Sequence, residues 1–127
     1  MTINLPPVFQ ILSNSAAVTD IVGTNPVRIF LFSAPQGTEN PYIVYHLPNR
    51  VPENLLAQVP KVDFDRVQFD VYAQDAIQTL DLCAAVRDAL EPHGHLVLML
   101  EMERLEPENL TRWVMDFNFW TGRDETN

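Results

Sequence analysis

Several residue types are scarce in this chain, and each shortage argues against a class of protein. A single cysteine, Cys83, among 127 residues allows neither an internal disulfide nor a cysteine-based metal cluster. The sequence has no apolar run long enough to span a bilayer, and its opening residues MTINLPPVFQIL lack the basic segment and cleavage site of a secretory signal. We therefore expect a chain that is made and folds in the cytoplasm and has no membrane partner.

Basic residues are scarce as well. The chain has eight Lys and Arg residues against 17 Asp and Glu, for a formal net charge of −9, and Lys61 is its only lysine. Such a surface repels nucleic-acid phosphates and offers no basic stripe to hold a duplex. The composition argues against specific binding of DNA or RNA, but an acidic surface suits a protein that lies near DNA without holding it.

Glycine is rarer than proline, with four glycines against ten prolines. This balance predicts rigid turns rather than flexible linkers. The length predicts one domain, residues 1–127. We expect its last residues, RDETN at 123–127, to form a polar and mobile tail.

The strongest pattern among the residues present lies between Lys61 and Gly94. In its first part Val67, Phe69 and Val71 alternate with polar residues, which is typical of a strand with one face on a core. The chain then changes from a two-residue period to a helical one. We therefore expect a long strand that leads directly into a helix covering the sheet.

The predicted helix runs from Ala76 to Leu90. Its apolar positions recur at steps of three and four along one stripe: Ala76, Leu80, Cys83, Val86 and Leu90. Asp75 is placed to cap the helix, and Pro92 and Gly94 are placed to end it. Cys83 is interpreted as a small buried hydrophobe, and Arg87, inside the stripe, is expected to pair with a carboxylate.

The other predicted elements complete a sheet with helices on one face. They are a helical region over Leu5–Val22 broken at Ser13–Ser15, and strands over Val27–Phe32, Tyr42–Leu47, His95–Pro107 and Leu110–Gly122. The order is helix, strand, strand, strand, helix, strand, strand. It predicts an α+β domain with a twisted, mainly antiparallel sheet of about five strands and helices packed on one face.

A 14-residue connection, Pro48–Lys61, separates the second and third predicted strands and carries three prolines. Loops of this length are usually functional. Its apolar residues either fold back onto their own core or form an arm that meets another subunit. If it is an arm, its interface residues are Arg50, Glu53, Leu55, Leu56, Val59 and Lys61.

Chemistry-bearing motifs are weak. His93 and His95 could offer two imidazoles to a metal, but a zinc site needs about four ligands and only His46 and the acids could add to them. The acids alternate with apolar residues, as on a solvated face. No phosphate-binding glycine loop, dinucleotide fingerprint or nucleophile elbow is present. We expect no enzyme, catalytic residue, cofactor or metal, and the alternative is a small metal-dependent hydrolase that uses His93 and His95.

Six segments, in order, resemble the tail-completion or tail-terminator proteins of long-tailed (siphophage-type) bacteriophages. They are AAVTDIVGT (16–24), RIFLFSAPQG (28–37), PYIVYHL (41–47), RVQFDVYAQD (66–75), AAVRDAL (84–90) and DFNFWTG (116–122). The resemblance covers nearly the whole chain. It implies a structural virion protein at the junction between head and tail.

What the resemblance implies is a ring, commonly of six copies, at the head-proximal end of the tail tube. The ring ends tube polymerisation and presents a surface to the head-completion or neck protein, so the expected partners are other copies, the tail tube protein and that neck protein. Genomic DNA passes through the ring without specific binding. From the net charge we expect acids to line this channel, with Asp63, Asp65, Glu101 and Glu103 as candidates. The alternative within the same class is another neck or head-completion component.

Overall fold

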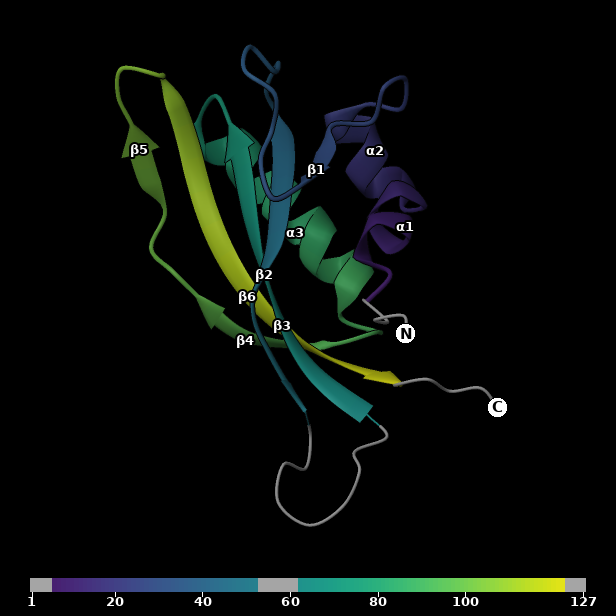
Figure 1. Cartoon of the computed structure of the whole chain (residues 1–127). Helices are drawn as coiled ribbons and strands as arrows, with labels where there is room; N and C mark the ends of the chain where they lie inside the picture. The colour runs from purple at the N-terminus through teal and green to yellow at the C-terminus, as the bar shows by residue number, and fades with distance from the viewer. Residues whose placement is uncertain (1–5, 53–61, 123–127) are drawn as a thin grey trace.

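The structure, a computed structural model, describes residues 6–52 and 62–122, with side chains over 6–47 and 65–119 (Figure 1). Its helices are α1 (Val8–Ser13), α2 (Ala16–Val22) and α3 (Ala76–Leu90). Its strands are β1 (Ile29–Leu31), β2 (Tyr42–Pro52), β3 (Val62–Ala73), β4 (His95–Met99), β5 (Glu103–Leu105) and β6 (Leu110–Gly122). No helix in the described part of the chain is long and apolar enough to cross a membrane.

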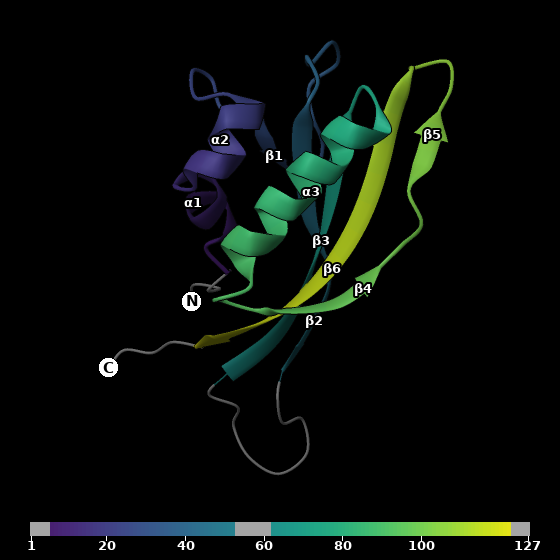
Figure 2. The ribbon, with the colours of Figure 1, turned by 180° about the vertical axis from the view of Figure 1, so that it is seen from behind.

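The strands form one six-stranded sheet in the order β1-β2-β3-β6-β4, and β5 also pairs with β6. All pairings are antiparallel except the one between β1 and β2, which is parallel. The helices lie on one face of the sheet, as Figure 2 shows with α3 in front of the strands. The predicted α+β class and its mainly antiparallel sheet are therefore confirmed.

The helix ends follow from local sequence chemistry. The Ser15 side chain accepts a hydrogen bond from the Val18 amide at 3.3 Å, which begins α2 after the predicted break. Gly23 ends that helix with φ of +90°, a conformation that costs a residue without Cβ little. Asp75 caps α3 by accepting from the Gln78 amide at 2.9 Å.

The core lies between the helices and the middle of the sheet. The predicted alternation is confirmed, because its inward side chains on the two central strands are fully buried or nearly so: Val67, Phe69, Val71, Met115, Phe117 and Phe119. The ring of Phe69 meets the ring of Phe117 edge to face, with centroids 5.8 Å apart. The two central strands therefore hold the fold together.

The predicted stripe of α3 is wrong at its N-terminal end. Leu80 is exposed, whereas Thr79 and Leu82 are buried. Thr79 tolerates burial because its hydroxyl donates to the Asp75 carbonyl at 2.7 Å, which satisfies its polar group. Arg87 is exposed, and it forms the expected ion pair, with Glu91 at 2.8 Å. The stripe is rotated, and it leaves apolar side chains on the outer face of the helix.

The predicted loop over Pro48–Lys61 is too long, because residues 48–52 belong to β2. The register shifts between His46 and Asn49, so that Leu47 and Pro48 lie opposite Val67 as a bulge. A bulge tolerates a proline because the missing amide hydrogen is not needed for the ladder there. The predicted strand over His95–Pro107 is likewise divided, into β4 and β5, by residues 100–102.

Candidate interaction surfaces

The β2–β3 hairpin extends past the helices, with the end of β6 paired beside β3 (Figure 1). Its described residues, 48–52 and 62–66, are called the arm below. The pairing continues to its end, where Pro52 lies opposite Asp63. Arg50 lies opposite Asp65 in this register. The predicted arm residues Glu53, Leu55, Leu56, Val59 and Lys61 lie outside the described residues. The described part of the arm is therefore a paired, projecting element, and the apolar sequence at 53–61 connects its two strands along the chain.

The predicted acidic residues do not gather on one surface. Asp65 is fully buried, and it shares the helix-facing side of β3 with Val67. Glu103 is exposed on β5, where its carboxylate lies 3.5 Å from Arg112 on β6. Glu101 is exposed in the segment between β4 and β5. The side chain of Asp63 lies outside the described side chains, so Glu101 and Glu103 are the two of these four predicted acids that the structure places in solvent.

The helical layer ends at α3, and the outer strands β4 and β5 extend beyond it (Figure 2). An apolar groove lies beside α3 at this position. It has a volume of about 500 Å³. Its lining comprises Leu80, Cys83, Ala84, Arg87, Asp88, Glu91, Met99 and Trp113. The groove, called the α3–β4 groove below, is apolar at the end near Leu80, Met99 and Trp113 and charged at the end near Asp88 and Glu91.

Further exposed apolar side chains lie on the elements that form this groove. Ile77 is 73% exposed on α3, Val97 and Leu98 are exposed on the edge strand β4, and Leu100 is exposed directly after it. The sequence carried a signal for this surface, because both faces of the strand beginning at His95 are apolar. Only one face of this strand packs against the core, so the other apolar face is left in solvent. That second face is a candidate interaction site, and the sequence analysis did not assign it.

A second apolar surface lies at the opposite edge of the sheet, on β1. Leu31 is exposed and Phe32 is 78% exposed. Phe32 also has φ of +78°, which is uncommon for a residue with a Cβ, and its amide donates to the Tyr45 carbonyl at 2.7 Å. Phe32 thus combines an unfavourable backbone conformation with a solvent-exposed aromatic ring. Strain of this kind is concentrated at functional positions.

The sheet face opposite the helices carries a polar network centred on Asp70, which is nearly buried. Its carboxylate accepts from Gln68 Nε2 at 2.9 Å and from the Tyr72 hydroxyl at 3.5 Å, and it lies 3.3 Å from Arg112 Nη2. Burial, with the Asp70 charge next to it, raises the pKa of Tyr72 to about 12. Tyr72 therefore stays protonated and neutral at neutral pH.

Asp116 lies on the same face and is only 8% exposed. Burial raises the pKa of this carboxyl, and the nearby Asp70 charge raises it further, while Arg66 and His46 act in the opposite direction. Among the described residues, the Asp116 Oδ1 atom has no hydrogen-bond partner. Burial therefore disfavours the charged form of this carboxyl in the folded chain.

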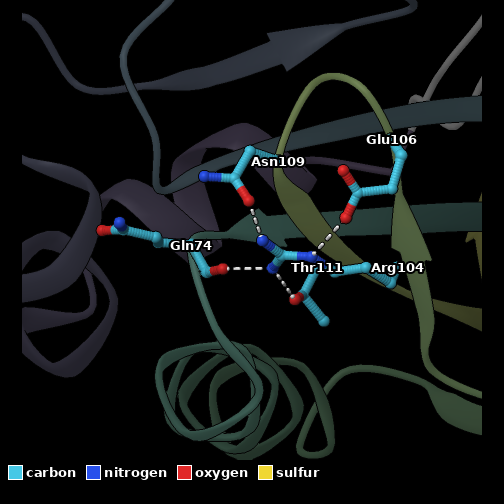
Figure 3. Close-up of polar contacts among 5 residues, drawn as sticks. All are labelled: Gln74, Arg104, Glu106, Asn109 and Thr111. Carbon is cyan, nitrogen blue, oxygen red and sulfur yellow. Dashed lines mark hydrogen bonds and ion pairs between the residues drawn. The ribbon is translucent and has the colours of Figure 1, made fainter.

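Arg104 joins one end of the sheet to the start of α3 (Figure 3). Its guanidinium donates to the Gln74 carbonyl, to Asn109 Oδ1 and, at 2.9 Å, to the Thr111 hydroxyl, and it lies 3.3 Å from the Glu106 carboxylate. The planar guanidinium can make these contacts simultaneously, as an ammonium cannot. Sequence reasoning missed Arg104, because its partners are brought together only by the β5–β6 hairpin.

The two candidate metal ligands, His93 and His95, are not joined by further ligands among the described residues. His93 lies in the turn after α3 and His95 begins β4, and both are exposed. The described residues contain no cluster of three or more His, Cys, Asp or Glu that could hold a metal ion. Gly94 between the histidines packs tightly, since a Cβ there would lie 2.7 Å from the Phe119 ring. The turn has a packing role.

Cys83 lies beneath the α3–β4 groove. Its Sγ is 3.3 Å from Met115 Sδ in the core. Burial raises the pKa of the thiol to about 11 although Arg87 lowers it. The thiol therefore stays protonated and unreactive, in agreement with its interpretation as a buried hydrophobe.

The comparisons with known proteins decide the family. The model of the family described as "Tail completion protein gp17" matches residues 6–122. The chain belongs to this family. It is accordingly a structural component of the phage virion, located in the tail, and not an enzyme. The predicted family, location and absence of catalysis are thereby confirmed.

Solved structures share the fold of this tail completion protein. A chain of the structure titled "Virion of native gene transfer agent (GTA) particle" has a TM-score of 0.63 at 19% identity, covering 91% of this chain and 92% of that chain. The structure of bacteriophage SPP1 gp17 protein has a TM-score of 0.55 at 14% identity, covering 94% and 88%. No curated protein matches by sequence. The similarity to these structures extends over nearly the whole domain.

Proposed function

We propose that this tail completion protein forms a ring of identical copies, a homohexamer, at the head-proximal end of the phage tail tube. One face of the ring caps the last ring of tube protein and ends polymerisation. The other face binds the head-completion or neck protein and joins tail to head. The observation that carries the proposal is the family match over residues 6–122.

The distribution of exposed apolar surface supports a ring. The two apolar surfaces lie on different edges of the sheet, Phe32 at the β1 edge and Leu98 at the β4 edge. Two different surfaces that bind each other give a heterologous contact, which repeats around an axis until the ring closes. A self-complementary patch would instead give a two-fold dimer. The arrangement therefore favours a cyclic assembly.

The proposed activity is binding alone. Tube protein adds to a growing end because each ring offers a copy of the surface that it has just bound. A ring of a different protein that matches the last tube ring on one side and the neck on the other stops this addition. Burial of apolar surface, at about 25 cal/mol per Å², supplies the free energy for such capping.

The test is a capping assay on tails assembled without this protein. Tail tubes from a phage that lacks its gene are incubated with the purified protein, and electron microscopy records tube length and the density at each tube end. We expect a ring at one end only, arrested growth, and restored joining to heads. Tubes that continue to grow with the protein present would overturn the proposal.

The same assay separates the alternative. If the protein binds purified heads but not tube ends, it is a different neck or head-completion component. A protein that binds neither heads nor tubes, in an assay where tubes join heads once the wild-type lysate is added, contradicts both proposals.

A further inference from the structure

The apolar end of the α3–β4 groove is a surface prepared for another polypeptide. Leu80, which is 48% exposed, lines the groove together with Met99 and Trp113, and Leu100, also 48% exposed, follows Met99 in the chain. A volume of about 500 Å³ lies within the range of sites that enclose a ligand or side chains, about 300–1,000 Å³. Exposed apolar surface of this extent costs free energy in water, and a protein partner that covers it recovers that free energy.

The chain supplies a segment with the matching chemistry. Residues 53–61, ENLLAQVPK, lie outside the described structure and connect the two strands of the arm. They contain three large aliphatic residues, Leu55, Leu56 and Val59, within nine residues. β2 and β3 fix the positions between which segment 53–61 must run, because Pro52 and Asp63 are paired at the end of the arm.

The covalent geometry prevents the segment from reaching the groove of its own chain. Trp113 and Met115 lie level with Val71 and Phe69 on β3, and at about 3.3 Å per residue these lie roughly 23–30 Å from Val62. The nine-residue segment must leave the arm and return to it, so its tip extends at most about 15 Å. Figure 2 shows the arm projecting away from α3. A segment that fills this groove must therefore come from another copy.

Charge also favours this occupant. The polar end of the groove carries Asp88 and Glu91, and Arg87 is already paired with Glu91 at 2.8 Å. Lys61, the only lysine in the chain, closes the apolar segment. A lysine beside Val59 would meet the acidic end of the groove when the leucines occupy the apolar end. The pairing adds orientation more than affinity, because ion pairs at a surface contribute about 1 kcal/mol or less.

We propose that the α3–β4 groove of each copy receives segment 53–61 from the adjacent copy. Leu55, Leu56 and Val59 pack against Leu80, Met99 and Trp113, and Lys61 faces Asp88. Each copy then gives one arm and accepts one arm. The inference rests on the proposed ring and specifies its subunit contact.

Cysteine cross-linking in assembled tails tests the contact. In a Cys83→Ala background, Leu56→Cys places a thiol on the arm and Ala84→Cys places one in the groove, at an exposed residue. Mild oxidation of purified tails should give a covalent ladder that ends at the ring size on a non-reducing gel. A mixture of the two single-cysteine chains should give dimers only. Thr24→Cys, exposed on the turn after α2, replaces Ala84→Cys as the control and should give no ladder.

The outcomes separate the contact from the ring itself. A ring present at tail ends without cross-linking above the control overturns the groove contact and leaves the ring intact. A fast-migrating monomer that carries an internal cross-link overturns it as well, since the arm would then reach its own groove. If the chains fold but never reach tube ends, whether they bind heads or remain free, the proposed function is contradicted. The inference is then contradicted with it.

Discussion

Asp116 is a single residue that links the stability of the fold to pH. Its carboxyl is nearly buried and one oxygen lacks a partner among the described residues, so the charged form is favoured less in the folded chain than in the unfolded chain. A carboxyl whose pKa is raised by folding binds protons more tightly in the folded state. Its contribution to stability therefore falls as pH rises through the folded pKa.

We expect Asp116→Asn to be more stable than the wild type at pH 7. The difference should shrink as the pH falls toward about 4, the ordinary pKa of an aspartate, because both side chains are then neutral. Urea unfolding of the two proteins at a series of pH values measures it. Asp88→Asn, at an exposed position on α3, is the matched control and should change little. A variant less stable than wild type at pH 7 would mean that attraction to Arg66 exceeds the cost of burial.

Gly94 illustrates packing at the same scale. A Cβ at this position would lie 2.7 Å from the Phe119 ring and 2.8 Å from the Asn118 carbonyl oxygen. We expect Gly94→Ala to lower the free energy of unfolding by about 1–3 kcal/mol through overpacking. Phe119→Leu removes part of the ring, so Gly94→Ala should cost less in that background. Chemical denaturation of the double-mutant cycle tests this, and equal costs in both backgrounds would refute the contact.

At the scale of elements, the bounds of a helix or strand can be predicted from sequence where capping and turn residues next to it determine them. The α3 helix has the predicted bounds, Ala76–Leu90, because Asp75 caps one end and Pro92 follows the other. The β6 strand also has its predicted bounds, since its alternation is long and turn residues precede it. The extension of β2 beyond Pro48 was missed, because it depends on pairing with a strand many residues away. The parallel pairing of β1 with β2 has the same non-local origin.

The interaction surfaces were harder to predict than the elements. The composition of the Pro48–Lys61 connection left open whether it folds back or forms an arm, and its residues 53–61 lie outside the described structure, so the interface role stays a prediction. The α3–β4 groove was not identified, because its lining comes from α3, β4 and β6 and its exposure depends on where the helical layer ends. Leu80 was assigned to the core by its spacing alone, and only the packed structure places it at the surface. Burial is a property of the assembled fold that periodicity only approximates.

The arm carries the prediction that belongs to this scale. We expect Leu55→Asp combined with Leu56→Asp to leave the domain folded and to abolish ring formation or tube capping, because two charges cannot enter an apolar groove without a large desolvation cost. Circular dichroism measures the fold, and negative-stain microscopy with the capping assay measures assembly. Asn54→Asp, which adds a charge beside these leucines, is the control. Normal capping by the double variant would show that the arm tip is not at an interface.

At the scale of the whole molecule, the net charge of −9 per chain would make the proposed ring strongly acidic. Acids that face a channel repel DNA phosphates at short range, and salt screens the repulsion beyond about 8 Å. The DNA can then slide through without a strong binding step. Glu101 and Glu103 are the solvent-facing acids that we assign to this channel.

We expect Glu101→Gln with Glu103→Gln to slow DNA ejection and to lower infectivity, with a larger effect at low salt. Ejection from purified particles, triggered in vitro and followed with a DNA-binding dye, measures the rate. Glu39→Gln, an exposed acid on the connection between β1 and β2, is the control with a smaller charge change. Ejection at the wild-type rate at every salt concentration would place these acids outside the channel.

The two outer edges of the sheet are short or interrupted, which bears on whether copies of this protein can pair edge to edge. The β1 edge spans only Ile29–Leu31, and the opposite edge is interrupted between Met99 and Glu103. A long, even strand edge would recruit further chains by backbone hydrogen bonding and grow into fibres. We therefore expect neither edge strand, β1 or β4, to act as such a template when many copies are present at high concentration. If the protein ends tube growth as proposed, its short edges would also keep it from starting a polymer of its own.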